Sequence, residues 1–203
     1  MTENNINETK NRKMEIEKVQ KHIKNRKNKA SSCNFDKNMV SIYAWVKTLV
    51  CVHDALPNII KLIDKMVTAK ASNPAAGSAI FGDYKHGTFN QIQEVLDMQE
   101  RKLSLINVYT IIETMVQSLS DEHREFVRLK YYKRKTMQYI SQALEIDERT
   151  AFRWSNTVLN KLVDFCIKNN WSEIFFISQT KGEPWIKDHY NKYYKNLLAC
   201  VKN

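Results

Sequence analysis

Apolar residues recur at intervals of three and four along most of the chain, which is the spacing of one face of an α-helix. Residues 37–55 and 58–70 each carry such a face. Pro57 separates them, because proline removes a backbone donor and clashes with the preceding helical turn. Residues 71–88 hold three of the four glycines and predict a loop. A long helix is expected after this loop, with Thr88 as its N-cap.

The helix after this loop carries apolar residues at heptad spacing, and Lys102 is the exception to the pattern. The residues at this spacing are Val95, Met98, Leu105, Tyr109, Ile112, Val116 and Leu119. Alternating steps of three and four predict pairing with another helix. That partner is either the chain's own 58–70 segment, which would form a helical hairpin, or the same helix of a second copy. Residues 36–118 are therefore interpreted as a helical scaffold, with helix 89–118 as the route to a homo-oligomer.

Three small polar residues mark the starts of three further helices in residues 119–167. Ser120, Thr136 and Asp147 can each accept a hydrogen bond from a free backbone N–H of a first turn. The second of these helices is short, and Ala151 is small enough to let the second and third helices cross closely. Two helices joined by a tight turn in this way predict a helix-turn-helix inside an all-α fold.

The outward face of the third of these helices carries groups suited to reading DNA. We expect base contacts from Arg149, Thr150, Phe152, Arg153 and Asn156. In the major groove, arginine reads guanine and asparagine reads adenine through paired hydrogen bonds. We expect phosphate contacts from Lys133, Arg134, Lys135 and Lys161. The same pattern leaves one alternative open, which is an ordinary three-helix bundle with a solvated basic face.

The charge distribution favours an anionic partner. The chain has 32 Lys and Arg against 22 Asp and Glu, a formal net charge of +10. The positive excess lies in residues 1–30 and after residue 122, while the middle is slightly acidic. This segregation indicates a central scaffold with an anion-binding module, for which double-stranded DNA is the first candidate. A membrane is not expected, because no apolar run of 18 residues and no signal peptide is found.

The patterns of catalytic and metal sites are missing from the sequence. Neither GxGxxG nor GxxxxGK[ST] occurs, and the five histidines form no HExxH motif or Cys/His cluster. The four cysteines include no CxxC pair. We therefore expect no enzyme activity, no cofactor and no metal. The protein is interpreted as cytoplasmic, where its cysteines stay reduced.

The two ends of the chain differ in character. Residues 1–35 are polar and lysine-rich, and are interpreted as a basic arm that is either an exposed helix or disordered. Residues 168–203 are interpreted as a separate aromatic and basic extension. Its aromatic residues include Trp171, Phe175, Phe176, Trp185, Tyr190, Tyr193 and Tyr194. These side chains either fold back onto the preceding domain, stack on exposed bases, or form a surface for a partner such as RNA polymerase.

Residues 119–166 resemble the region-four helix-turn-helix of bacterial sigma factors, and more closely the RinA/ArpU-like phage late-gene regulators built around that motif. The matching stretches are FVRLKYYKRKTMQYISQAL, EIDERTAFRW and VLNKL. The resemblance reaches more weakly back to residue 58. It implies a sequence-specific DNA-binding regulator that activates a late operon with host RNA polymerase. The chain departs from the pattern at Glu145, where glycine is frequent; this implies either a left-handed backbone or a different turn.

Two other functions stay open from the sequence. A divergent sigma-like factor would bind core RNA polymerase directly, although residues 37–118 show no region-two pattern with an aromatic melting face. A DNA-packaging protein similar to a small terminase subunit would combine a helix-turn-helix with helical oligomerisation. A ring-forming oligomer would favour packaging, and a dimer with promoter specificity would favour the regulator.

Overall fold

The computed structural model describes residues 33–72 and 84–201, and every regular element in them is helical. The elements are α2 (Cys33–Val52), η1 (His53–Ala55), α3 (Leu56–Ser72), α4 (Tyr84–Gln117), α5 (Asp121–Val127), η2 (Arg128–Tyr132), α6 (Met137–Ala143), α7 (Glu148–Lys168), α8 (Glu173–Gln179) and α9 (Pro184–Val201). The predicted all-α fold class is therefore confirmed for these residues. The predicted basic arm at residues 1–35 lies almost entirely outside them.

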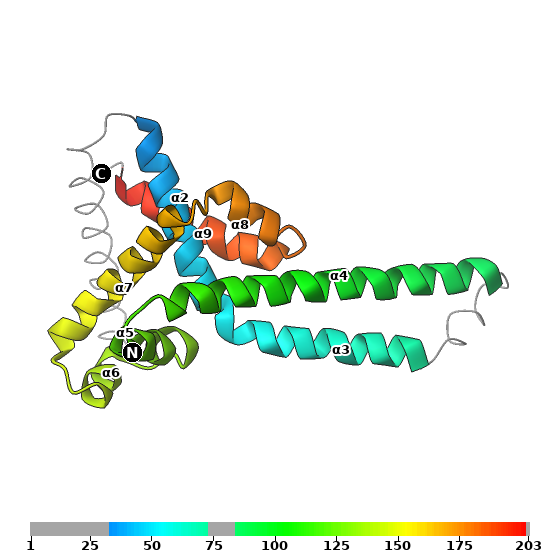
Figure 1. Cartoon of the computed structure of the whole chain (residues 1–203), viewed down its shortest axis with the longest axis horizontal. Coiled ribbons are helices and arrows are strands. Elements are labelled where there is room, and N and C mark those ends of the chain that lie inside the picture. Colours follow the sequence, from blue (N-terminus) through cyan, green and yellow to red (C-terminus); the bar gives the residue numbers. More distant parts are fainter. Residues whose placement is uncertain (1–32, 73–83, 202–203) are drawn as a thin grey trace.

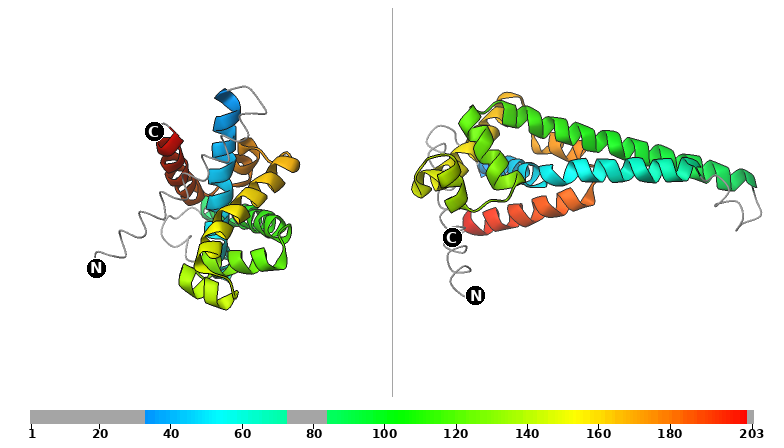
Figure 2. Two further views of the ribbon diagram at one scale, coloured as in Figure 1. Left: turned by 90° about the vertical axis from the view of Figure 1, so that its left-hand side faces the viewer. Right: turned by 90° about the horizontal axis from the view of Figure 1, so that it is seen from below.

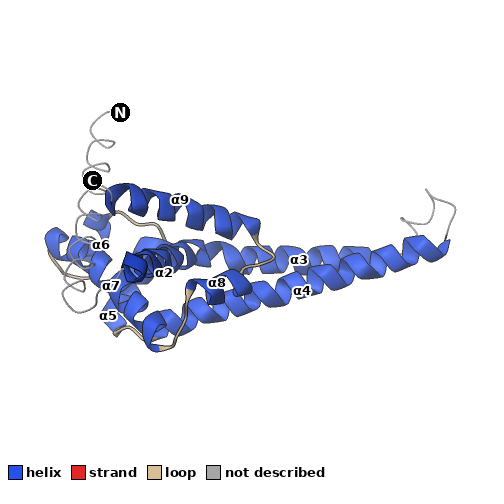
Figure 3. Ribbon diagram, turned by 90° about the horizontal axis from the view of Figure 1, so that it is seen from above, coloured by secondary structure: helices blue, strands red, loops and turns tan. Residues whose placement is uncertain are grey.

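The helix α2 is the centre of the body of the molecule. Figure 3 shows it end-on, with α9 on one side and α8 on the other, and it also packs against α7. Three consecutive residues, Ala44, Trp45 and Val46, are each at most 1% exposed. Because consecutive residues point in different directions around a helix, α2 has no polar face at this level and must be enclosed by other helices. The aromatic extension and the scaffold segment thus share one hydrophobic core.

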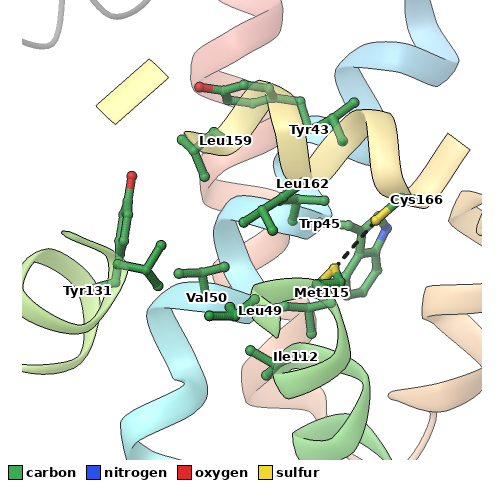
Figure 4. Close-up of a cluster of buried hydrophobic side chains, with 14 of the residues drawn as sticks. Tyr43, Trp45, Leu49, Val50, Ile112, Met115, Tyr131, Leu159, Leu162 and Cys166 are labelled. Carbon is green, nitrogen blue, oxygen red and sulfur yellow. Dashed lines mark hydrogen bonds between the residues drawn. The ribbon is translucent and has the colours of Figure 1, made fainter. Parts of the chain in front are cut away.

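The interior of this core joins residues that are far apart in the sequence. Figure 4 shows Leu49 of α2 close to Met115 of α4, with Leu162 of α7 above them. The Sγ of Cys166 donates to the Sδ of Met115 across 3.4 Å. Burial raises the pKa of the Cys166 thiol to about 12, so this group stays protonated.

The chain turns from the body into a long arm at Pro57. α2 ends at Val52, a single 3₁₀ turn follows, and Pro57 is the second residue of α3, where its missing N–H breaks no helical hydrogen bond. By length and composition alone, the stretch Asn38–Lys70 has the hydropathy of a membrane-spanning helix, but 78% of its apolar window is buried inside the protein. This burial is typical of a core helix.

The arm consists of α3 and α4, which run side by side in opposite directions and extend away from the body (Figure 1). The heptad row of α4 faces α3 and the body, and its members Leu105 and Ile112 are fully buried. Lys102, the exception in the row, lies at the arm interface, where its Nζ donates to Asp64 Oδ1 of α3 across 2.6 Å. The heptad row thus contacts a helix of the same chain.

The predicted N-cap of the long helix is wrong. α4 begins at Tyr84, so Thr88 lies inside the helix and not at its start. Gly87 was expected in the loop but lies in the first turns of α4, while residues 73–83 of the predicted loop lie outside the described residues. A single glycine weakens a helix by only about 1 kcal/mol and does not end it when packing continues beyond it.

The C-terminal helices fold back onto α2. The ring of Tyr190 stacks on Trp45 with centroids 4.3 Å apart, and Phe176 lies 6.0 Å from the same indole. The hydroxyl of Tyr190 lies 3.0 Å from Ser41 Oγ and donates to Glu173 Oε1 across 2.8 Å. Of the three alternatives for residues 168–203, folding back is the one that the structure shows for these aromatic residues.

A buried carboxylate connects α9 to the arm. Glu183, just before α9, is 0% exposed and accepts hydrogen bonds from Arg101 Nε at 2.7 Å and Arg101 Nη2 at 3.0 Å. It also accepts from Trp185 Nε1 at 2.6 Å. The side chain of Ser104, three residues along α4, donates to the carbonyl of Gln179. These contacts fix the connection between α8 and α9 against the base of the arm.

Candidate nucleic-acid interface

Residues 119–168 form a unit on one side of the body, which we call the three-helix unit. It consists of α5 with its continuation η2, the short helix α6 and the longer helix α7. α5 continues into η2, and α6 and α7 follow after a loop and a turn; α6 and α7 pack against each other (Figure 2). The side chains of Phe126, Ile140, Ala151 and Val158 fill its interior and are all 0% exposed. Ala151 is fully buried on α7, in agreement with its predicted role as a small residue at a close helix crossing.

Two of the three predicted N-caps are confirmed. The hydroxyl of Thr136 accepts from Tyr139 N at 3.2 Å, and Asp147 Oδ1 accepts from Thr150 N at 2.8 Å. The hydrogen bonds from Thr150 also lower the pKa of the Asp147 carboxyl. Ser120 occupies the N-cap position of α5, but its hydroxyl lies 2.7 Å from His123 Nδ1 and bonds no backbone N–H. The side chain of His123 thus replaces the backbone as the partner of Ser120.

The turn between α6 and α7 has the left-handed conformation that glycine would favour. Glu145 has a φ of 53°, so the first of the two alternatives for this residue is correct. Its neighbours complete the turn, because Leu144 N donates to Ile140 O and Ile146 N donates to Ser141 O, both across 3.0 Å. A non-glycine residue in this conformation costs about 1–2 kcal/mol.

We expect Glu145→Gly to raise the free energy of unfolding by about 0.5–1 kcal/mol, because the relief of left-handed strain exceeds the extra chain entropy of glycine. Urea denaturation measures the change. Gln142→Gly, at an exposed position within α6, is the matched control and should lower stability by about 0.5–1 kcal/mol. A loss of stability in Glu145→Gly would show that the side chain stabilises the turn.

The start of α7 presents two arginines to solvent. Arg149 and Arg153 are exposed, and Arg153 Nη2 donates to Thr150 Oγ1 across 2.9 Å. Thr150 is partly exposed and its hydroxyl donates to Asp147 Oδ2, so the cap of the helix also orients Arg153. Phe152 is partly exposed beside them. The structure therefore brings four of the five predicted base-contacting residues to the exposed or partly exposed start of one helix.

The predicted outward position of Asn156 is wrong. Its side chain is 7% exposed, and its Oδ1 is buried without a hydrogen-bond partner. α7 packs against α2 as well as α6, so its buried face is wider than a three-helix unit alone would require. The next residue, Thr157, is exposed instead. It follows Arg153 by four residues, and this helical spacing could have identified it from the sequence as a neighbour of Arg153.

Exposed polar residues continue along the same side of α7. Arg149, Arg153, Thr157 and Lys161 follow one another at intervals of four residues, and all are exposed. A helix rises 1.5 Å per residue, so this row is about 18 Å long. Its length exceeds the width of a DNA major groove, about 12 Å. A groove of that width would therefore hold only part of the row.

Lys161 lies at a shallow hollow between α7 and the start of α5. Its Nζ is 3.2 Å from His123 Nδ1, and Ser118, Ser120, Asp164 and Lys168 also line the hollow. Burial first, and then the charge of Lys161, lower the pKa of His123. A neutral imidazole accepts from the ammonium without compensating its charge, so the hollow carries the charges of two lysines and one carboxylate.

The loop before α6 holds the other predicted phosphate contacts. Lys133, Arg134 and Lys135 are all exposed, and Arg134 has a φ of 50°. Backbone bonds hold the loop, because Lys133 N donates to Arg128 O and Lys135 N donates to Leu129 O, both across 2.9 Å. The Nζ of Lys135 lies 5.0 Å above the ring of Tyr139. This cation–π contact orients the ammonium beside the first turn of α6.

None of the cations at these positions forms a direct ion pair with a carboxylate in the part of the chain that the structure describes, although the charges of Lys133 and Arg153 act on Glu125 and Asp147 from further away. The cations are Lys133, Arg134, Lys135, Arg149, Arg153 and Lys161. Their neighbours behave differently, since Arg124 pairs with Asp121 and Arg128 pairs with Glu125. The three-helix unit therefore has two kinds of cation. Some are available to an external anion, and others are neutralised by acidic residues three positions away.

A second group of polar residues is buried where η1 meets α4 and η2. His53 Nε2 lies 2.5 Å from Glu113 Oε1, and its ring stacks on that of Tyr132 at 3.7 Å. Burial lowers the pKa of His53 and raises that of Tyr132. Among the described residues, no three His, Cys, Asp or Glu side chains gather in a way that could hold a metal ion. This group of polar residues lies where the arm packs against the three-helix unit.

These features define an all-helical protein in which a core helix carries both a two-helix arm and a cationic three-helix unit. The chain belongs to the family described as protein of unknown function DUF722, which matches residues 52–164. The matched region runs from the end of α2 through α3 and α4 to near the end of α7. No curated protein and no solved structure matches the chain.

Proposed function

We propose that this protein is a sequence-specific DNA-binding transcription regulator of phage or prophage type. The observation that carries the proposal is the set of six exposed cations on α7 and on the loop before α6, none of which forms a direct ion pair with a carboxylate of the described residues. In protein–DNA interfaces, phosphate contacts come largely from such lysines and arginines, and the free energy of binding includes the release of counterions from DNA.

In the proposed complex, the first half of α7 lies in the major groove as the recognition helix of a helix-turn-helix. Arg149 and Arg153 contact guanine, while Phe152 packs on a thymine methyl group. Thr150 both closes the cap with Asp147 and holds the Arg153 guanidinium, which reduces the entropy that Arg153 loses on binding. The buried Asn156 takes no part in base contacts.

Phosphate contacts fix the helix in the groove. The Lys133–Lys135 loop lies directly before the N-cap Thr136 of α6. Lys161 binds the backbone at the other end of the exposed row. A protein that neutralises several phosphates in this way loses affinity steeply as salt rises.

The resemblance of residues 119–166 to phage late-gene regulators extends the proposal from DNA binding to regulation. On this proposal the protein activates a late operon together with host RNA polymerase. The proposal is distinguishable from DNA packaging, since a packaging protein would bind DNA with little preference among promoter sequences.

We expect Arg153→Ala to reduce affinity for a specific site by about 1–3 kcal/mol while leaving weak non-specific binding nearly unchanged. Gel-shift titration at fixed salt measures both. Arg128→Ala removes an exposed arginine that is paired with Glu125, and as the matched control it should change neither. Equal losses on all sequences for Arg153→Ala would contradict base recognition by this residue.

Replacing Lys133, Arg134 and Lys135 by alanine should instead weaken binding to all sequences and reduce the slope of log affinity against log salt concentration by about 2–3.

A further inference from the structure

The arm carries a second apolar row that does not face α3. It consists of Phe89, Ile92, Leu96, Leu103 and Ile106 on α4, with exposed fractions of 64%, 54%, 52%, 60% and 36%. The half-buried Gln99 occupies the remaining heptad position between Leu96 and Leu103. We call these six residues the outer row. Its steps of three and four are those of a helix that packs against another helix along its length.

The outer row is separate from the row that contacts α3. An α-helix advances about 100° per residue, so the outer row is displaced by about 100° around the α4 axis from the row that contains Leu105 and Ile112. The two rows let one helix pack against α3 on one side and against a further helix on another. Figure 1 shows α4 extending well beyond the body, where the outer row begins.

The outer row is as large as the apolar patches that often mark a binding surface. Its five apolar side chains together expose on the order of 500 Å², in the upper part of the range of about 300–600 Å² for the largest apolar patch of a typical monomer. A two-fold pair of such rows would bury about 1,000 Å², which is near the lower limit for a specific interface. Flanking polar residues would add to this area. The exposed surface is therefore sufficient for a dimer interface.

We infer that the occupant of the outer row is the same row of a second copy, in an antiparallel α4–α4 pairing. The row has the same spacing when read in either direction. A two-fold axis between residues 97 and 98 places Phe89 opposite Ile106 of the second copy, Ile92 opposite Leu103 and Leu96 opposite Gln99. This self-complementarity is what an isologous dimer interface requires.

The composition of the outer row supports pairing with another helix. It contains no Lys, Arg, Asp or Glu, so the row itself places no charge in the seam. Gln99 is the one polar member and lies opposite Leu96 in this register, which lowers the stability of the seam. This interface differs from the dimer seam expected from the sequence, because the residues of that seam are used within the chain.

The test uses the full chain and measures mass in solution by sedimentation equilibrium at concentrations from about 1 to 100 µM. The wild-type protein should be a dimer of a 23.9 kDa chain. Ile92→Glu and Leu103→Lys should each weaken the dimer about tenfold or more, because each places two unpaired charges in the seam. The control Asn90→Lys changes an exposed residue of the same helix that lies off the row, and should stay dimeric.

The double variant Ile92→Glu and Leu103→Lys tests the register. These positions are opposite each other only in the antiparallel pairing, so the double variant should regain the dimer. Circular dichroism checks that each variant is folded. A monomeric wild-type protein, or a dimer unaffected by Leu103→Lys, would overturn the inference. Single variants that dissociate without rescue in the double variant would overturn the antiparallel register.

Discussion

Replacing Trp45 by alanine is expected to lower the free energy of unfolding by about 3–5 kcal/mol. Trp45 is 1% exposed at the centre of α2, where it stacks on Tyr190 of α9 and lies close to Phe176 of α8. Truncation removes the aromatic contacts that Trp45 makes with both C-terminal helices and leaves a cavity in the core. Chemical denaturation followed by far-ultraviolet circular dichroism measures the loss.

Trp45→Phe is the matched control for this prediction. The indole Nε1 is buried and has no hydrogen-bond partner among the described residues. Phenylalanine keeps the aromatic contacts and removes a donor whose burial costs about 1–3 kcal/mol. This gain offsets part of the lost volume, so the phenylalanine variant should be much less destabilised than the alanine variant. Similar losses in both variants would contradict the assignment of an unsatisfied indole.

Replacing Glu183 by alanine is expected to cost about 3 kcal/mol, at the lower end for breaking a buried ion pair. The carboxylate is 0% exposed, and its loss leaves Arg101 and the indole N–H of Trp185 without their acceptor. The Arg101 side chain is 47% exposed, so water can reach it, which limits the cost. In a chain of this size the midpoint of thermal unfolding should fall by about 6–12 °C.

A second ion pair of the arm is the control for Glu183→Ala. Asp64 accepts from Lys102 across 2.6 Å between α3 and α4, and the aspartate side chain is 49% exposed. Asp64→Ala should cost at most about 1 kcal/mol, because solvent screens a pair of this kind. Equal effects of the two variants would show that burial of Glu183 adds nothing, and would contradict its role in fixing α9 to the arm.

The helix starts that were predicted correctly are those with a local signal. Thr136 and Asp147 cap α6 and α7 because a small acceptor side chain stands directly before a helical segment in each case. Thr88 has the same chemistry but lies inside α4, because the helix already begins at Tyr84. A cap can therefore be predicted from sequence only where the chain before it is not itself helical.

The errors at the candidate site arise from contacts between distant parts of the chain. Asn156 is buried although its position on a three-helix unit alone would be outward. The presence of α2 beside α7 follows from the folding of residues 33–52 into the centre of the body, which no local pattern of α7 encodes. Arg149 and Arg153 were predicted correctly as exposed, because both lie on the side of α7 away from the buried residues Ala151 and Val158.

The two heptad rows of α4 overlap in the sequence, so one row makes the other difficult to recognise. The row through Leu105 and Ile112 was found in the sequence because it is long: it runs from Val95 to Leu119 with Lys102 as its one exception. The outer row uses the same heptad spacing on the same helix, and Gln99 interrupts it. Only the burial of one row by α3 shows that the other is left exposed, and this burial is a property of the fold.

A binding selection on random duplex DNA with the full chain, at one fixed near-physiological salt concentration, tests the central claim most directly. Salt must be fixed because phosphate contacts alone make affinity depend steeply on it. The account predicts an enriched motif that the protein prefers over competitor DNA, and a loss of that preference in Arg153→Ala. Binding without enrichment, or no binding to DNA at all, would contradict the proposal that α7 reads a DNA sequence.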